Sequence, residues 1–494
     1  MTSGALPTPT SSTALLQPGT NCWRIEHADR FAFIVDADEY FKTVRAAMLN
    51  ARKSILLIGW DFDTRVQLAA DPGDNGPASL GELFLWLVKR TPSLEIRLLR
   101  WDTGAFKTLL RGNTLITVLR WMAHRRITIK LDAIHPLAAS HHQKIVVIDD
   151  KLAFCGGIDI TSGRWDQRDH SDNNPRRHLP NGKPYGPWHD ATSALSGPAA
   201  RAMGDLARQR WQMVTGQSLP PCEDATDPWP DKLTPTFEQV QLAIARTIPD
   251  MDDAPGTHEI EQIYLDLIAS ADRFIYAESQ YFASRKIARA IAQRLTAPNP
   301  PEIVVINPVT AEGWLEPVAM DSARARLVEA IQRLDTQDRF RMYHPVTQDS
   351  EAIYVHAKIF VVDDRYLRVG SSNFNNRSMR LDTECDVIVS AQDAQDTEAR
   401  QTITRLRDDL LAEHLDVEPA QVSQALTQSG SLIAAIESLR RNGRTLTPYV
   451  LPELGETEKW LADNEILDPE GPDQMFESLT KRGLFKHWRT IWKR

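Results

Sequence analysis

Two short stretches of this chain carry the same reactive residues at the same spacing. The first places His142, Lys144 and Asp149 in the pattern His-x-Lys-x-x-x-x-Asp, and the second repeats it with His356, Lys358 and Asp363. Every residue of the second copy follows its counterpart by 214 positions. A register kept this well indicates an internal duplication, so the chain is interpreted as two related halves.

Imidazole and ammonium groups at this spacing can act together on an anion. On a strand, residues i and i+2 point to the same face, so His142 would share a site with Lys144, and His356 with Lys358. If the halves pack about a pseudo-two-fold axis, both pairs meet between them. Two lysines could then neutralise a phosphodiester while one imidazole attacks phosphorus and the other protonates the leaving oxygen. Asp149 and Asp363 fall on the opposite parity, which predicts structural caps.

Each histidine also needs a carboxylate that fixes its tautomer. Asp190 and Glu384 each stand at the start of a strand that follows the repeated motif. We therefore predict Asp190 as the partner of His142 and Glu384 as the partner of His356.

A turn of small residues follows each motif. The first turn is Gly156-Gly157-Ile158-Asp159 and the second is Gly370-Ser371-Ser372-Asn373. Gly156 and Gly157 fit either a tight turn or a close approach of the backbone to phosphate. Four further histidines fit a functional role and a surface or loop position equally well: His141, His170, His178 and His189.

Alternating helical and strand patterns predict the scaffold of the site. In the first half we expect helices at 38–51, 80–89 and 115–125, and strands at 54–60, 94–100, 127–131 and 142–149. In the second half we expect helices at 260–271, 322–334 and 396–415, and strands at 273–277, 301–308 and 340–344 before the second motif. The fold class is therefore α/β: two pseudo-symmetric α/β/α lobes with mixed, mostly parallel sheets and the active site at their interface.

The predicted organisation has five parts. These are a flexible tail over 1–29, a first lobe over 30–216, a linker over 217–257, a second lobe over 258–415 and a helical extension over 416–494. The first lobe includes a polar, proline-rich insertion at 164–187, and long loops of this kind are more often functional than not.

Composition narrows the function classes. The 494 residues carry a net charge of −9 with a pI near 5.8, which argues against a nucleic-acid partner. The four cysteines show no CxxC spacing, so neither a metal site nor a disulfide framework is expected. No secretory signal and no membrane-spanning run is recognised. We expect a cytoplasmic or peripheral membrane protein, with signal-less secretion as an open alternative, and a monomer is plausible.

The duplicated motif resembles the signature of the phospholipase D superfamily. The similarity extends to four more blocks in the order that eukaryotic-type members show: Ala153–Ile160 with Gly163–Asp166, Pro187–Asp190, Ile275–Phe282, and Gly370–Glu384. In the third block, Ser279 stands where Asn is commoner. The resemblance covers roughly residues 30–415, and modules such as PX, PH or C2 are not recognised.

The resemblance implies roles for individual residues. His142 would be the nucleophile that forms a phosphohistidine, although pseudo-symmetry leaves the choice of histidine open. His356 would protonate the leaving alcohol and then activate water. Lys144, Lys358 and Asn373 would bind phosphate, with Asp159 as the first-half counterpart of Asn373, and neither a metal nor another cofactor would be required.

The expected activity is hydrolysis of phosphatidylcholine- or phosphatidylethanolamine-type lipids to phosphatidic acid, with transfer to alcohols. Alternatives are a cardiolipin synthase-like phosphatidyltransferase, a phosphodiesterase or nuclease of the superfamily, and a binding protein that has lost activity. The intact motif in both halves disfavours the last.

The final segment, 481–494, is basic and aromatic. On a helix, its apolar residues would share one face, which is typical of an interfacial membrane helix. The same pattern also fits a helix docked on the protein core.

Overall fold

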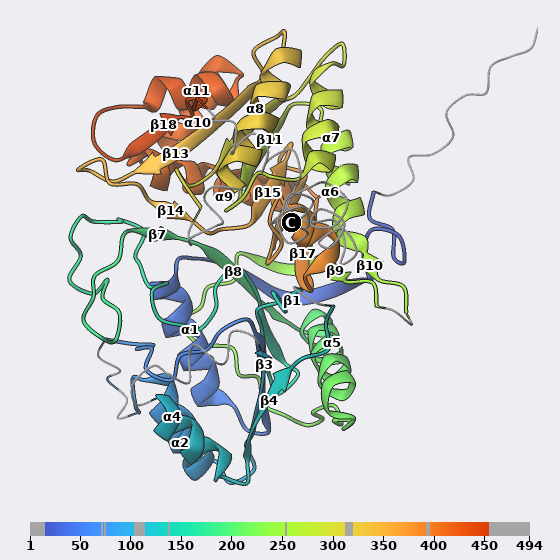
Figure 1. The fold of residues 1–494 in the computed structure, drawn as a ribbon, viewed down its shortest axis with the longest axis vertical. Coiled ribbons are helices and arrows are strands. Elements are labelled where there is room, and N and C mark those ends of the chain that lie inside the picture. Colours follow the sequence, from blue (N-terminus) through green and yellow to red (C-terminus); the bar gives the residue numbers. More distant parts are fainter. Residues whose placement is uncertain are drawn as a thin grey trace, which may run out of the picture.

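The computed structural model describes residues 15–70, 73, 76–102, 114–136, 139–251, 254–311, 320–391 and 396–453. A mixed sheet of 16 strands forms its centre and runs through both halves of the chain, with helices packed on it (Figure 1). The predicted α/β class is confirmed.

The N-terminal half of the sheet extends from β1 to β4 in the order β1-β8-β6-β5-β2-β3-β4. Its strands are β1 (Arg24–Val35), β2 (Ser54–Gly59), β3 (Glu95–Trp101), β4 (Ile127–Asp132), β5 (Ile145–Ile148), β6 (Leu152–Gly156) and β8 (Ala191–Ser196). Its helices are α1 (Ala37–Asn50), α2 (Leu80–Arg90), α4 (Thr114–Met122) and α5 (Pro198–Thr215).

The C-terminal half repeats this order as β9-β17-β16-β15-β11-β12-β13. Its strands are β9 (Phe237–Ile248), β11 (Phe274–Glu278), β12 (Glu302–Ile306), β13 (Phe340–Val346), β15 (Ile359–Val362), β16 (Tyr366–Gly370) and β17 (Glu384–Ser390), with the short β10 (Thr257–His258) paired to β9. Its helices are α6 (Glu259–Ser270), α7 (Arg285–Leu295), α8 (Ser322–Leu334), α9 (Thr397–Leu415) and the π-helical turn η2 (Arg377–Leu381).

The two halves meet where β1 pairs with β9. This pair is antiparallel, as a two-fold relation requires, and β9 also pairs with β17. Two predicted boundaries are therefore wrong. Residues 24–29 belong to β1 rather than to a flexible tail, and the expected linker 217–257 contains β9, whose alternating Val240, Leu242 and Ile244 are buried.

The direction of the strands also differs from expectation. Among the strands of the described ranges, parallel pairing is limited to β2-β3-β4, β11-β12-β13 and a separate two-stranded pair, β7 (Trp188–His189) with β14 (Tyr354–Val355). The other strand pairs named here are antiparallel, and two of them, β5–β6 and β15–β16, are hairpins with short connections. The sheet is mixed, but it is not mostly parallel.

The extension after residue 415 is only partly helical. It forms α10 (Pro419–Ser429), α11 (Leu432–Leu439) and then β18 (Thr445–Pro448), which adds to the sheet edge beside β13. The proposed interfacial segment 481–494 lies outside the described residues. Among the helices of the described ranges, none combines the length and hydropathy needed to cross a bilayer.

Candidate active site

The two histidine–lysine segments lie between the halves, but they are not strands. His142 and Lys144 precede β5, and His356 and Lys358 precede β15. The expectation that strand parity alone aligns them is therefore wrong. Each segment is instead held by main-chain bonds to the other half: His142 N–H donates to Thr383 O at 3.0 Å, and His356 N–H donates to His189 O at 2.7 Å.

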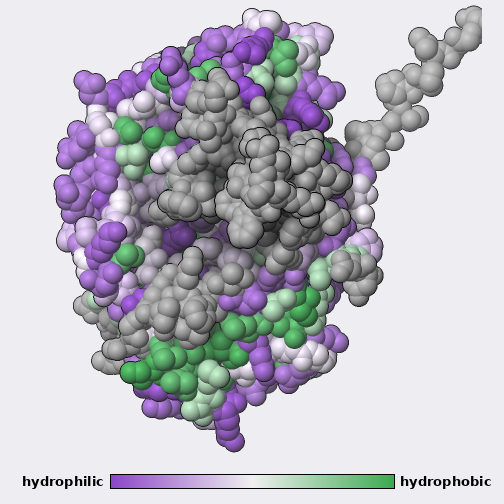
Figure 2. All heavy atoms as spheres, viewed as in Figure 1, coloured by the Kyte–Doolittle hydropathy of each residue, from purple (hydrophilic) through white to green (hydrophobic). Residues whose placement is uncertain are grey.

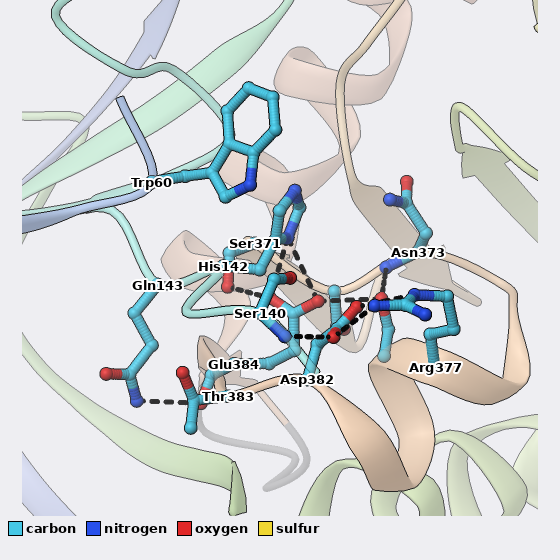
Figure 3. Close-up of polar contacts among 12 residues, drawn as sticks. Trp60, Ser140, His142, Gln143, Ser371, Asn373, Arg377, Asp382, Thr383 and Glu384 are labelled. Atoms are coloured by element: carbon cyan, nitrogen blue, oxygen red, sulfur yellow. Dashed lines mark hydrogen bonds and ion pairs between the residues drawn. The ribbon is translucent and has the colours of Figure 1, made fainter. Parts of the chain in front are cut away.

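This crossing determines which carboxylate serves which histidine. His142 Nδ1 lies 3.0 Å from both carboxylate oxygens of Glu384 (Figure 3). His356 Nδ1 lies 2.6 Å from Asp190 Oδ2. The pairing is the reverse of the sequence-based assignment, which placed both members of each pair in the same half. Glu384 begins β17, and Asp190 lies between β7 and β8. The residues just before each carboxylate run beside the motif of the other half, so each histidine receives its partner from across the interface.

Gly157 makes room for the carboxylate that holds His356. A Cβ atom at Gly157 would lie 2.2 Å from Asp190 Oδ1, and one at Gly156 would lie 2.3 Å from Thr192 Cα. Both glycines therefore serve close packing against β8 and the residue before it. This favours a packing role over the suggested approach of backbone to phosphate.

Glu384 is held by two hydroxyl groups besides His142. Ser371 Oγ donates to Oε2 at 2.5 Å, and Ser378 Oγ donates to Oε1 at 2.7 Å (Figure 3). Burial raises the pKa of Glu384 to about 8 and that of Asp190 to about 6. Both carboxyl groups are fully enclosed, so the position of each histidine ring is fixed by buried partners.

The two lysines are anchored in matching ways. Lys144 Nζ donates to His142 O at 2.9 Å, and Lys358 Nζ donates to His356 O. Lys144 also pairs with Asp159 at 3.2 Å. Asp159 Oδ1 accepts the backbone N–H of Trp60 at 3.2 Å, so we assign Asp159 to holding Lys144 rather than to binding phosphate.

Asn373 occupies the place on the C-terminal side that Asp159 occupies on the N-terminal side. Its Nδ2 donates to Gln280 Oε1 at 3.4 Å, and the same oxygen lies 3.4 Å from Lys358 Nζ. Asn373 Oδ1 is buried without a hydrogen-bond partner among the described residues. This oxygen can only accept a hydrogen bond, so a phosphate oxygen would be bound by the second N–H of Asn373 Nδ2.

The site has a positive electrostatic character. Burial and the ammonium groups of Lys144 and Lys358 hold the pKa of His142 well below its usual value. Burial, Lys358 and Arg164 do the same for the pKa of His356. Burial lowers the pKa of Lys358 to about 7 against the opposing effect of Asp190. These groups all favour an anion in the space they surround.

Comparison with known proteins agrees with this arrangement. A family model described as "Phospholipase D" matches residues 47–227, and one described as "Cardiolipin synthase, PLD-like domain" matches residues 264–406. Together these matches include both motifs and both orienting carboxylates.

The chain belongs to the phospholipase D superfamily.

Curated phospholipases D are similar over most of the chain. Phospholipase D A of Dictyostelium discoideum is 26% identical over 78% of this chain and 35% of its own length. Phospholipase D alpha 1 of Nicotiana tabacum is 24% identical over 70% of this chain and 59% of its own length. The chain thus spans about a third to three-fifths of the length of these relatives. Its similarity to them supports the conclusion that the chain is an enzyme of the phospholipase D superfamily.

A solved structure shares the fold. The phosphatidylserine synthase of Haemophilus influenzae aligns with a TM-score of 0.53 over 90% of this chain and 95% of its own, at 14% sequence identity. At this identity the likeness concerns the architecture alone.

The motif aspartates serve as caps in this phospholipase D scaffold. Asp149 accepts the backbone N–H groups of residues 52–54 at 2.7 Å each. Asp363 accepts those of residues 272–274 at 2.7 to 2.8 Å. Each carboxylate therefore ties its motif strand to the start of the neighbouring strand and faces away from the histidines.

The structure distinguishes the four histidines whose role the sequence did not decide by their burial and contacts. His178 is exposed, and its Nδ1 bonds Pro175 O. His141 is buried and lies 2.9 Å from Asp132 Oδ1. His170 and His189 are fully buried and lie in one cluster behind the site.

Sequence reasoning missed three groups beside the two histidine–lysine pairs. Gln280 contacts both Lys358 and Asn373, and the Trp188 ring is tilted against that of His356 with the ring centroids 5.3 Å apart. Arg164 lies over the Trp188 ring at 4.2 Å. Gln280 and Trp188 were part of the blocks that carried the family resemblance, so the motif context was the available signal.

Proposed function

We propose that this protein is a phospholipase D that hydrolyses the distal phosphodiester bond of phospholipids through a phosphohistidine intermediate. The observation that carries the proposal is the pair of histidines between the halves. Each has its Nδ1 held by a buried carboxylate, which leaves Nε2 for the reaction. In this proposal the Nε2 of His142 carries no proton and attacks, and the Nε2 of His356 carries the proton that it donates.

In the first step, His142 Nε2 attacks phosphorus and forms the P–N bond while the bond to the headgroup oxygen breaks. The resulting imidazolium keeps its Nδ1–H on Glu384, because its positive charge lowers the pKa of that buried carboxyl and favours the ionised form. His356 gives its Nε2 proton to the leaving headgroup oxygen, and Asp190 holds that ring in place. A bound phosphodiester contributes a negative charge that offsets the nearby ammonium groups and so favours a proton on His356.

In the second step, water enters on the side that the headgroup has left. His356 removes a proton from this water, the P–N bond to His142 breaks, and phosphatidic acid forms. An alcohol in place of water would give a phosphatidyl alcohol by the same route. Transphosphatidylation is therefore part of the proposal.

The phosphate would lie among Lys144, Lys358 and Asn373. The two ammonium groups neutralise the non-bridging oxygens, and the Asn373 amide donates a hydrogen bond to them. Because these donors are fixed before substrate arrives, they stabilise the charge of the pentacoordinate transition state at little cost in reorganisation.

A phospholipid surface is the partner that this activity requires, and an exposed apolar face on the N-terminal half supports it. The outward side chains of α4 and β4 are 45 to 63% exposed: Leu115, Ile116, Leu119, Met122 and Leu131. Figure 2 shows apolar side chains gathered in a band across this part of the surface. Contiguous apolar area of this kind is typical of interaction surfaces.

The test is a panel of phospholipid classes presented as liposomes with and without ethanol, with products resolved by mass spectrometry. We expect headgroup release, phosphatidic acid, and phosphatidylethanol when ethanol is present. Deleting residues 481–494 in the same assay tests whether that segment contributes to membrane binding. No headgroup release from any lipid class, together with nicking of plasmid DNA, would overturn the proposal.

A phosphatidyltransferase is the second candidate, because the model that matches the C-terminal half is described by a cardiolipin synthase. Such an enzyme uses the same intermediate but resolves it with a lipid alcohol. Adding phosphatidylglycerol or glycerol to the panel separates the two, since a transferase would give little phosphatidic acid and mainly the transfer product.

A further inference from the structure

A second group of titratable side chains lies behind His356 and is not used by the proposed chemistry. Asp36, His170, His189 and Glu413 converge there, with side chains no more than 1% exposed. Each offers one nitrogen or oxygen atom, and these atoms all lie within 4.8 Å of one another. The residues come from the β1–α1 turn, the 164–187 loop, β7 and α9, so the cluster joins both halves.

Four separations within the cluster are close to those of ligands around one small ion. His189 Nδ1 lies 2.8 Å from Glu413 Oε1 and 3.4 Å from Asp36 Oδ1. His170 Nε2 lies 3.1 Å from Glu413 Oε1 and 3.7 Å from Asp36 Oδ2. Tetrahedral ligands at the usual zinc–nitrogen and zinc–oxygen distances sit about 3.3 Å apart.

The outer partners of both imidazoles follow the pattern of metal-ligating histidines. His170 turns Nε2 to the cluster, while its Nδ1 lies 3.0 Å from Asp166 Oδ2. His189 turns Nδ1 to the cluster, while its Nε2 lies 2.7 Å from Glu278 Oε2. A carboxylate on the far nitrogen fixes the tautomer and raises the basicity of the nitrogen that faces a metal ion.

Two atoms that face the cluster lack hydrogen bonds. Asp36 Oδ2 is buried and has no hydrogen-bond partner among the described residues, and His189 Nδ1 contacts Glu413 Oε1 at ion-pair distance, 2.8 Å, without hydrogen-bond geometry. Buried polar atoms in native proteins are normally satisfied, and each exception calls for an explanation. A cation bound between them would satisfy both atoms at once.

We propose that Asp36, His170, His189 and Glu413 bind one Zn²⁺ ion. Two neutral imidazoles and two carboxylates form a charge-neutral set with a divalent ion, and this mixture of nitrogen and oxygen ligands suits zinc. Four protein ligands complete a tetrahedron and leave no open position. The ion is therefore structural, and the phosphohistidine chemistry does not pass through it.

The site would stabilise the His356–Asp190 pair. Asp36 Oδ1 accepts the backbone N–H of Asp190 at 3.1 Å. His189 O accepts the backbone N–H of His356 at 2.7 Å. Two of the four ligands thus hold the main chain of the general acid and of its orienting carboxylate, while Glu413 brings α9 of the C-terminal half to the same point.

The metal content of the full-length chain tests the proposal without reference to activity. The protein is purified without chelators, dialysed against metal-free buffer and measured by inductively coupled plasma mass spectrometry. We expect about one zinc per chain. Protein produced with Co²⁺ in place of zinc should show the intense visible absorption of tetrahedral Co²⁺.

Variants locate the ion. His170→Gln and Glu413→Gln should each reduce the zinc content at least about tenfold. His344→Gln is the matched control, because His344 is buried but its Nδ1 bonds the carbonyl oxygen of Asn307. This control should keep its zinc.

Three results would overturn the proposal. One is folded wild-type protein that holds no stoichiometric metal even after refolding with Zn²⁺, which would mean that protons on the imidazoles take the place of the ion. Another is zinc that persists in both cluster variants. A different divalent ion at one per chain would refute the choice of zinc. If the variants fail to fold, the metal content and cobalt spectrum of the wild type still decide.

Discussion

Substituting the two orienting carboxylates should separate the histidines by the chemical step each performs. Asp190→Asn removes the negative charge from the group that lies 2.6 Å from His356 Nδ1. Glu384→Gln removes the acidic group whose two oxygens lie 3.0 Å from His142 Nδ1, and so the negative charge that this group can carry opposite an imidazolium. Both replacements keep the size of the side chain, so the cavity and most packing are preserved.

The expected magnitudes follow from these contacts. A hydrogen bond to a charged group contributes about 1.5–3 kcal/mol, so each substitution should slow choline release about 10- to 150-fold. With a p-nitrophenyl headgroup, the leaving oxygen needs little proton donation. With this substrate, Asp190→Asn should reduce the rate of headgroup release by less than about 5-fold, because His356 acts only as the acid in the first step. Glu384→Gln should keep its full loss, since His142 must still attack.

The assay compares phosphatidylcholine with phosphatidyl-p-nitrophenol in mixed micelles and follows the p-nitrophenolate burst by stopped flow. His356→Ala should show the same leaving-group profile as Asp190→Asn. Asp149→Asn is the matched control, because this buried carboxylate caps a backbone turn and should change stability without changing the profile. If Glu384→Gln, rather than Asp190→Asn, shared the profile of His356→Ala, the crossed pairing would be refuted.

Three further predictions concern the same site. His142→Ala and His356→Ala should each abolish hydrolysis of phosphatidylcholine while circular dichroism and the melting temperature show a retained fold; full activity in either variant would contradict the two-histidine mechanism. Because the pKa of Lys358 is lowered to about 7 and its protonated form binds phosphate, kcat/KM should fall as pH rises through about 7, whereas kcat should fall only at higher pH, since bound phosphate favours the charged lysine. Lys358→Arg should remove this basic limb from the pH profile even if its rate is lower, and a limb that stayed near pH 7 would assign it to another group. Gly157→Ala should reduce activity at least about 100-fold and stability by about 1–3 kcal/mol, because its Cβ would lie 2.2 Å from Asp190 Oδ1; Gly186→Ala, at an exposed position, is the control and should behave as wild type in both measurements.

The reactive residues and most helices could be predicted from the sequence because their signals are local. The helix expected at 38–51 is α1, and the helix expected at 396–415 is α9. The repeat placed His142 and His356 in equivalent positions, which the structure retains. What the sequence could not provide was the partner of each histidine, because pairing across the interface depends on how the halves dock.

Two central strands were missed for a related reason. β1 and β9 lie at the junction of the halves, where composition suggested a tail and a linker. The alternation of apolar residues in β9 was a usable signal, but acidic and proline-rich neighbours obscured it. The cluster around His170 could not be predicted from the sequence either, because its members come from four separate elements of the chain.

The junction of β1 with β9 has a mechanical consequence. Main-chain hydrogen bonds join β17 to β9, β9 to β1 and β1 to β8, so one continuous sheet connects the two halves rigidly. Opening them like a clamshell would break several of these bonds together. The substrate of the proposed reaction and its product would therefore enter and leave past surface loops. Turnover should not require a large rigid-body motion of one half against the other.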